Sequence, residues 1–371
     1  TSGGRDLAAS HGLNHALMPA GVAFTDLTAF SGVRSFEVRV ELPVLMNASN
    51  AIAAIREQGG GQQLDPQTIQ QAASAIQTAM VAQPPGRSNF QQAVLQALGG
   101  GDTVSSVPTK QMPLTQQKDT AARIRLGIET RVLRLTQDAI SAHPAHEAFP
   151  GRVSADVPRV TQTIQVKPGI PGWQSTGLYA VAGEALQVTV PPELADKGYS
   201  VRIGCHSDTL YHLEKWERAP DITKSVTLTS IETRATSAFG GLIYIEVPAS
   251  ASAAAPVPVV ISGGIPAPLF VLGEHTDAQW ADEIRTRPAP WAELACDNII
   301  ITCQTEVARA IGNPTQLMQF WKQVVDAQDD ITNQTKERRR PERIVADVQI
   351  SAGYMHSGYP IMIPVSAAEE M

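Results

Sequence analysis

The sequence predicts a multidomain α+β protein in which a helical segment precedes a β-sandwich and a mixed unit of strands and helices. Three changes of pattern along the chain support this prediction. Apolar residues recur at helical spacing over 41–150, and from 158 to 265 they alternate with a period of two in short segments. Beyond 266, strand-like and helix-like segments follow one another. A chain of 371 residues is long enough for two or three such domains, each with its own core.

The expected helical connector, 41–150, contains one clear helix start. Asp65 is a good N-cap residue, and Pro66 suits the first helical position because its missing N–H has no intrahelical partner there. We expect two more helices, one from Ser88 and one from near Thr115. Apolar residues at helical spacing in the first and third helices are Ile69, Ala72, Ala73, Ile76, Ala79, Met80, Ile124, Ile128, Val132 and Leu135.

The β-sandwich is expected over 158–265. Seven short segments in about a hundred residues, separated by turns such as Ala182-Gly183-Glu184, are typical of a sandwich. The expected strands are 160–166, 177–181, 185–190, 199–205, 225–231, 241–247 and 257–262.

The last part of the chain, 266–371, combines both periods. We expect a helix capped by Thr276 and a longer helix that begins at Asn313-Pro314. The strands expected around these helices are 268–272, 297–302 and 342–351.

Charge and cysteine content exclude several classes of function. The formal net charge of -7 argues against a nucleic-acid partner, because phosphate binding needs a basic face. The uninterrupted apolar runs are too short for a transmembrane segment. The basic run around Arg338–Arg340 and Arg343 is interleaved with Glu and is expected to form a solvated face. An odd set of cysteines (Cys205, Cys296, Cys303) indicates free, buried thiols rather than a disulfide framework.

The residues offer no complete catalytic motif. A zinc-peptidase helix needs two His four residues apart, yet the only His-Glu pair, His146-Glu147, has Pro150 at the second His position. No Gly-x-Ser-x-Gly sequence occurs, so Ser357 beside His356 is not a nucleophile elbow.

The pair Cys205-His206, with Asp208 nearby, combines residue types that occur in nucleophile clusters. Because adjacent residues of the expected strand 199–205 and its continuation point to opposite faces, we expect a core or turn role for them instead.

Longer stretches carry a resemblance to a known family. They are Ser175-Thr176-Gly177-Leu178-Tyr179, Val201-Arg202-Ile203-Gly204-Cys205-His206-Ser207-Asp208, Gly240-Gly241-Leu242-Ile243-Tyr244-Ile245, Ala289-Pro290-Trp291-Ala292-Glu293-Leu294 and the run from Arg340 to Met362. In collinear order they resemble the enhancin-like, mucinase-type zinc metallopeptidases. The last run is most similar to the branch formed by the TRP-channel-associated factors. Residues 1–40 resemble the tail of an amidotransferase-like α/β domain only weakly.

This resemblance implies a jelly-roll-like β-sandwich over 158–265 followed by the incomplete N-terminal part of a gluzincin catalytic domain over 266–371. The His-Glu-x-x-His helix is then expected beyond Met371, so the parent protein would bind zinc while this chain would hold neither zinc nor catalytic residues. The implied function of the parent is cleavage of protein or O-glycosylated protein substrates, outside the cell or at its surface. The alternative is a non-catalytic binding or regulatory protein at the cytoplasmic face of a membrane, with a membrane-protein partner.

One segment is expected to touch the substrate. In gluzincins the edge strand of the catalytic sheet pairs with an extended peptide, and glycines permit close approach. The residues expected to form this strand are Gly353, Tyr354, Met355, His356, Ser357, Gly358 and Tyr359. The competing interpretation is a buried hairpin in which the polar atoms of His356 are satisfied internally.

Overall fold

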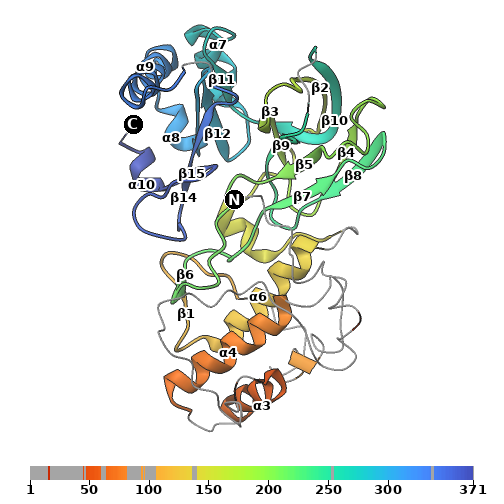
Figure 1. Ribbon diagram of the computed structural model, residues 1–371, viewed down its shortest axis with the longest axis vertical. Helices are drawn as coiled ribbons and strands as arrows, with labels where there is room; N and C mark the ends of the chain where they lie inside the picture. Colours follow the sequence, from red (N-terminus) through yellow and green to blue (C-terminus); the bar gives the residue numbers. More distant parts are fainter. Residues whose placement is uncertain are drawn as a thin grey trace. The chain divides into compact units, whose positions relative to one another are not determined.

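The computed structural model describes residues 16, 45, 47–59, 64–81, 93–94, 96, 106–135, 140–251, 255–335 and 338–370 (Figure 1). The expectations for 1–40 and for the helix starting at Ser88 lie outside these residues, apart from single positions. The chain divides into two compact units. The first comprises Thr1–Ser106, Met112–Thr136 and Glu214–Trp216, and the second comprises Val107–Gln111, Gln137–Leu213 and Glu217–Met371.

The first unit is built around three helices, α3 (Ala48–Gly59), α4 (Pro66–Val81) and α6 (Thr120–Leu135). The predicted cap of α4 is confirmed, because the Thr68 N–H donates to Asp65 Oδ1 over 2.9 Å. A two-stranded ribbon pairs β1 (Leu114–Thr115) with β6 (Lys215–Trp216) in antiparallel fashion. The helices share one apolar core made of Ala51, Ile52, Ile55, Ile69, Ala72, Ala73, Ile76, Val94, Ile124 and Ile128.

The β-sandwich of the second unit is an eight-stranded antiparallel sheet in the order β7-β5-β9-β3-β10-β4-β8, with β2 also paired to β10. Its strands are β2 (Val160–Val166), β3 (Gly172–Ala180), β4 (Ala185–Thr189), β5 (Ser200–Ile203), β7 (Lys224–Thr227), β8 (Glu232–Thr236), β9 (Gly241–Val247) and β10 (Val257–Pro266). The sequence predicted all of these in outline except β8, whose polar residues show no apolar alternation.

Strand β10 turns the corner between the two halves of the sandwich. Its first part pairs with β2 and β4, and its last two residues, Ile265 and Pro266, pair with β3. The register shifts between Ser262 and Gly264, and a strand that changes sheets commonly does so at such a bulge. Apolar side chains from both halves meet in a single core, so the predicted β-sandwich is confirmed.

The mixed part of the second unit contains a five-stranded sheet in the order β11-β12-β13-β14-β15. Its strands are β11 (Leu269–Val271), β12 (Trp291–Ala295), β13 (Ile299–Gln304), β14 (Glu342–Asp347) and β15 (Ile361–Pro364). Neighbouring strands are parallel except for the antiparallel pair β12 and β13. Strand β15 therefore lies at one edge of the sheet (Figure 1).

Helices α7 (Asp277–Asp282), α8 (Thr305–Arg309), α9 (Pro314–Thr332) and α10 (Val365–Ala368) accompany this sheet. The two predicted caps are confirmed: Thr276 forms a capping box with Gln279, and Asn313 accepts a hydrogen bond from the Gln316 N–H. Among the described residues no helix combines the length and apolar character needed to cross a bilayer.

Candidate functional site

The segment expected to contact substrate, 353–359, is a loop between β14 and β15. The prediction that it forms the edge strand is wrong, because most of these residues are bends, His356 forms only an isolated bridge to Met362, and the edge strand is Ile361–Pro364. Gly353 and Gly358 have φ values of +60° and +151°, which interrupt a regular strand. Tyr354 and Met355 are 65% and 63% exposed. The loop therefore presents two large apolar side chains to solvent.

The same loop folds back over the outer edge of β15. The His356 N–H donates to the Met362 carbonyl and the Met362 N–H donates to the His356 carbonyl, both over 3.3 Å. Because strand positions alternate, the other outward positions of this edge are Pro360 and Pro364, and proline has no N–H. Between Pro360 and Pro364 the edge consequently offers no unpaired donor to a peptide strand. Such protection is a common way of preventing strand addition.

The side chain of His356 is held by residues from both parts of the second unit. Its Nε2 lies 2.8 Å from Asp208 Oδ2 and 3.2 Å from Ser351 Oγ. Asp208 belongs to the sandwich, and its Oδ2 also accepts the Ser351 N–H over 2.6 Å. His212, also from the sandwich, places Nε2 3.0 Å from the Ser351 carbonyl. These contacts fix the base of the loop and satisfy the imidazole internally, as the competing hairpin interpretation expected, but the loop is exposed and not the buried hairpin of that interpretation.

The combination of Ser351, His356 and Asp208 does not form a hydrolase triad. In a triad the nucleophile and the carboxylate bind opposite nitrogens of the imidazole, so that one nitrogen takes the proton while the other is oriented. Here both partners approach Nε2, and Nδ1 lies 3.4 Å from the Ser357 carbonyl. The geometry therefore supports positioning of the loop rather than nucleophilic catalysis.

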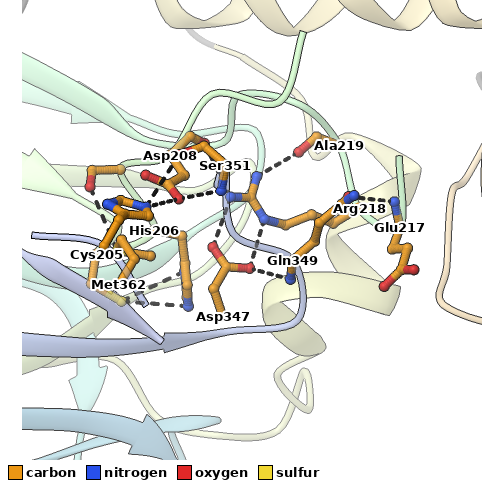
Figure 2. A network of polar contacts seen from close by, with 12 residues as sticks. Cys205, His206, Asp208, Glu217, Arg218, Ala219, Asp347, Gln349, Ser351 and Met362 are labelled. Atoms are coloured by element: carbon orange, nitrogen blue, oxygen red, sulfur yellow. Dashed lines mark hydrogen bonds and ion pairs between the residues drawn. The ribbon is translucent and has the colours of Figure 1, made fainter. Parts of the chain in front are cut away.

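A buried ion pair lies beside this cluster (Figure 2). Arg218 donates from Nε and Nη2 to the two oxygens of Asp347 over 2.8 and 2.7 Å, and both side chains are 0% exposed. The remaining Arg218 donors reach the carbonyls of Ala219 and Asp208. Asp347 Oδ1 also accepts the Gln349 N–H over 3.1 Å. Because Asp347 ends β14, this network joins the sandwich to the start of the loop.

Aromatic and arginine side chains hold the other end of the loop. The Arg340 guanidinium stacks over the Tyr359 ring at 3.5 Å, and the Tyr359 and Trp173 rings are 5.4 Å apart, edge to face. Arg202 covers Trp173 at 3.8 Å. Gly172 has a φ of +91°, which L side chains rarely adopt, and a Cβ added there would lie 3.2 Å from the Tyr359 ring, so glycine favours this contact.

A second buried ion pair corrects the interpretation of the basic run. Arg343 is 0% exposed and forms a salt bridge with Glu293, which also accepts hydrogen bonds from Tyr244 and Thr302 over 3.1 Å each. Arg338 is paired with Asp329 and Glu342. The expectation of a solvated face is therefore wrong for Arg343, which became buried because β14 is an inner strand of the sheet.

Cys205 and His206 lie in the core, as predicted, but for a different reason. Strand β5 ends at Ile203, so the two side chains do not point to opposite faces, and Cys205 Sγ lies 3.6 Å from His206 Nδ1. Burial raises the pKa of the Cys205 thiol. Burial and the positive charge of Arg218 hold the pKa of His206 well below its usual value. Both groups are thus neutral, which excludes an activated thiolate.

The described residues do not fit a catalytic zinc ion. No group of three or more His, Cys, Asp or Glu gathers within the described part of the chain. His146 ends a 3-10 turn, Pro144–His146, and Phe149 has extended backbone, so no helix presents a second ligand there. The prediction of free, buried cysteines is confirmed for Cys205, Cys296 and Cys303.

Comparison with protein families divides the same region in two. Residues 155–262 match the family described as the N-terminal domain of M60-like peptidases. Residues 263–371 match the family described as Peptidase M60, enhancin and enhancin-like.

Two curated relatives illustrate the similarity. TRPM8 channel-associated factor 2 of Homo sapiens is 40% identical over 213 residues, which cover 56% of this chain and 23% of the relative. TRPM8 channel-associated factor 3 of Rattus norvegicus is 42% identical over 201 residues, which cover 54% and 22%. The chain therefore spans less than a quarter of the length of these relatives.

Among solved structures, the IMPa metallopeptidase from Pseudomonas aeruginosa has a TM-score of 0.54 at 12% identity, covering 81% of this chain and 38% of that chain. The structure of IMPa in complex with an O-glycopeptide has a TM-score of 0.54 at 14% identity, covering 81% and 39%. At such identities the likeness extends to the fold alone.

Proposed function

Because residues 155–262 match the N-terminal domain of M60-like peptidases and residues 263–371 match the family of Peptidase M60, enhancin and enhancin-like, we propose that this chain supplies the β-sandwich and part of the catalytic-domain sheet of a metallopeptidase-fold protein that acts on protein substrates. The observation that carries the proposal is the consecutive match of both family domains over the sandwich and the five-stranded sheet. The substrate class that we propose is O-glycosylated protein. The complex of IMPa with an O-glycopeptide supports this choice, since IMPa shares the fold.

The substrate-facing element that we propose is the loop 353–359. Its exposed Tyr354 and Met355 are side chains of the kind that form energetic centres in protein interfaces. Its base is fixed by Asp208 and its far end by Trp173, so little conformational entropy is lost when a partner binds. Since the edge of β15 lacks free donors, contacts to a substrate would come from these side chains rather than from strand addition.

The proposed enzyme is a zinc peptidase. When bound, a zinc ion would supply Lewis-acid chemistry for peptide hydrolysis. The described residues do not offer its ligands, so we assign no catalytic step to any of them. Their part is to bind and orient the substrate.

A second candidate is supported by the identity of 40% with a TRPM8 channel-associated factor. Under this alternative the same surfaces bind a membrane-protein partner without catalysis. The two candidates also differ in their cellular location. We propose the cell surface or the extracellular space for the peptidase, and the cytoplasmic face of a membrane for the regulator.

One experiment separates them. The full-length protein that contains this chain is incubated with an O-glycosylated mucin and, separately, with that mucin after enzymatic removal of its O-glycans. Each reaction is repeated in the presence of a metal chelator. Fragments of the mucin are identified by mass spectrometry. Cleavage that requires both glycan and metal supports the peptidase. Intact substrate under all conditions, together with saturable binding to a channel protein, would favour the alternative.

The loop is tested in the same assay. Alanine at Tyr354 and Met355 is expected to raise KM for the glycoprotein by about tenfold, because two exposed anchors are removed. The control is Ile231→Ala, which removes another exposed apolar side chain from the sandwich. An equal change in KM for the control variant would exclude a specific role of the loop.

A further inference from the structure

The segment 207–218, between strands β5 and β7 of the sandwich, belongs partly to each compact unit of the chain. Its middle, Glu214–Trp216, is grouped with the first unit, whereas the residues up to Leu213 and from Glu217 onward are grouped with the second. The middle contains strand β6, which pairs with β1 of the first unit. One segment therefore has its two arms in the second unit and its tip, defined as Glu214–Trp216, in the first.

The tip is held inside the first unit by a buried arginine. Arg123 of α6 donates from Nη1 to the carbonyls of Glu214 over 2.7 Å and of Leu114 over 3.1 Å. Its guanidinium carbon also lies 4.1 Å from the centroid of the Trp216 ring, and the two residues are 4% and 0% exposed. Because a cation–π contact is strongest where water is excluded, this arrangement fixes the tip firmly.

The two arms contact the chain just before the loop 353–359. On one arm, His212 Nε2 lies 3.0 Å from the Ser351 carbonyl. On the other arm, the Glu217 N–H donates to Gln349 Oε1 over 2.7 Å (Figure 2). Glu217 directly follows Trp216, so its amide is one peptide unit away from the buried residue. The position of the tip therefore controls these two arm contacts.

The base of the segment is closed by hydrogen bonds that do not involve the tip. Arg218 Nη2 donates to the Asp208 carbonyl over 3.1 Å, and the Leu210 N–H donates to the Pro220 carbonyl over 3.0 Å. These bonds keep the base in place within the second unit. A loosened tip should consequently disturb the two arm contacts first and leave the buried ion pair of Arg218 intact.

We propose that Arg123 and Trp216 are positioning residues for the loop 353–359, because they set its geometry through the two arm contacts and thereby its fit to a substrate. The inference rests on the proposed function of this loop as the substrate-facing element. Both residues are buried, so they act through the segment and not by touching the substrate. Each arm contact is a single hydrogen bond, and a shift of about 1 Å at the tip is enough to break it.

The test replaces Arg123 by Met in the full-length protein that contains this chain. The change removes the cation–π contact and the hydrogen bonds to the tip but keeps a long side chain. Hydrogen-exchange mass spectrometry should show the amides of 349–353 exchanging at least about threefold faster. KM for an O-glycosylated mucin should rise at least about threefold, while kcat changes less than about twofold. The control Ile76→Ala destabilises the helical core of the same unit and should leave exchange and KM unchanged.

A reversible cross-link tests the same coupling within one molecule. The Gln116 N–H donates to the Glu214 carbonyl, so the adjacent Thr115 and Lys215 form a non-hydrogen-bonded pair. The Cα atoms of such a pair are about 4.5 Å apart, which is within the span of a disulfide. Thr115→Cys and Lys215→Cys, added to Arg123→Met, should restore slow exchange at 349–353 when oxidised and lose it again when reduced.

Four results would overturn the inference: unchanged exchange at 349–353 in Arg123→Met, an equal increase in Ile76→Ala, the same exchange in oxidised and reduced cross-linked protein, or an unchanged KM in a protein that cleaves the mucin. If Arg123→Met does not fold, Trp216→Phe takes its place. It keeps a buried ring but weakens the cation–π contact, and should raise exchange at 349–353 in the same direction.

Hydrogen exchange does not require cleavage, so the positioning role and the proposed peptidase can fail separately. Faster exchange at 349–353 in Arg123→Met, in a protein that leaves every mucin intact, would contradict only the peptidase. Unchanged exchange in a protein that cleaves the mucin would contradict only the positioning role.

Discussion

His356 Nε2 lies 2.8 Å from Asp208 Oδ2, although the two residues are 148 positions apart in the sequence. Asp208 follows β5 of the sandwich, and His356 lies in the loop before the edge strand β15. Their contact ties the exposed loop tip, Tyr354 and Met355, to a part of the protein that folds as a separate sheet. The sandwich thus acts as a support for the loop.

Replacing Asp208 by Asn should loosen this loop without unfolding the protein. The variant loses the contact with His356 and weakens the acceptor for the Ser351 N–H, which we expect to lower the unfolding free energy by about 1 kcal/mol. Amides of 351–358 should exchange with deuterium faster, as measured by hydrogen-exchange mass spectrometry.

The control for this experiment is Glu193→Gln, which neutralises an exposed carboxylate elsewhere on the sandwich. If exchange in the loop were unchanged in Asp208→Asn, or rose equally in the control, Asp208 would not be the residue that holds the loop.

The Arg218–Asp347 pair provides a second prediction. Arg218→Met leaves the Asp347 carboxylate buried without its partner, so we expect the unfolding free energy to fall by about 3–5 kcal/mol in urea denaturation. The double variant Arg218→Met/Asp347→Leu should recover a large part of this loss, because neither charge then remains in the core.

An ion pair at the surface of the sandwich serves as comparison. Arg159 and Glu184 also form two 2.6 Å hydrogen bonds, but their side chains are 26% and 43% exposed. Arg159→Met should therefore lower stability by no more than about 1 kcal/mol. Equal losses in Arg159→Met and Arg218→Met would contradict a special role of burial.

The depressed pKa of His206 predicts a pH dependence of stability. Burial, with a contribution from Arg218, keeps the folded imidazole neutral, whereas the unfolded chain takes up a proton below about pH 6.5. The unfolded state then binds more protons, so this residue's contribution to stability is lost as pH falls below that value, by about 1.4 kcal/mol per pH unit.

The measurement is the unfolding free energy between about pH 6.5 and 5.5. This window lies below the ordinary pKa of an imidazole and above those of carboxylates. His206→Phe keeps an aromatic ring between Phe149 and Trp291 but cannot titrate. The slope of its unfolding free energy against pH should be smaller, by about half a proton at pH 6.5 and by nearly one proton at pH 5.5, whatever its absolute stability. An unaltered slope would mean that His206 is protonated in the folded protein.

The corner strand β10 gives a fourth prediction through Gly263. Its φ is +94°, and an added Cβ would lie 2.7 Å from the Ala185 carbonyl oxygen. Gly273 has a similar φ of +86° with no atom near that position. Gly273→Ala should cost about 1–2 kcal/mol of conformational strain, and Gly263→Ala clearly more, in thermal or urea unfolding. Similar losses in both variants would show that the corner relaxes freely.

Several elements could be predicted from local sequence because short-range contacts define them. Asp65-Pro66, Thr276 and Asn313-Pro314 mark helix starts through caps that involve residues three positions away. The strands Val160–Val166 and Gly241–Val247 were predicted with the bounds that the structure shows. These patterns depend on which side chains face the core over a few residues.

The sequence did not predict β1, β6, β8, β12 and β15. Of these, β12 and β8 were missed for opposite reasons. β12, Trp291–Ala295, is buried at every position and therefore lacks alternation, and its central Glu293 resembles a surface residue until Arg343 is seen beside it. β8, Glu232–Thr236, is a polar edge strand that is held mainly by pairing with β4. Neither feature is visible in a local window.

The sequence by itself determined the order of a helical segment, a sandwich and a mixed unit, the similarity of 155–371 to two M60-like peptidase domains, and the positions of the main caps. Only the tertiary structure decided that 353–359 is a loop, that His356 is held by Asp208, and that Arg218 and Arg343 are core residues. The physical reason is distance along the chain. Periodicity and capping act within a few residues. The Arg218–Asp347 pair joins segments more than a hundred residues apart, and the burial of Arg343 depends on the order of the strands in the sheet.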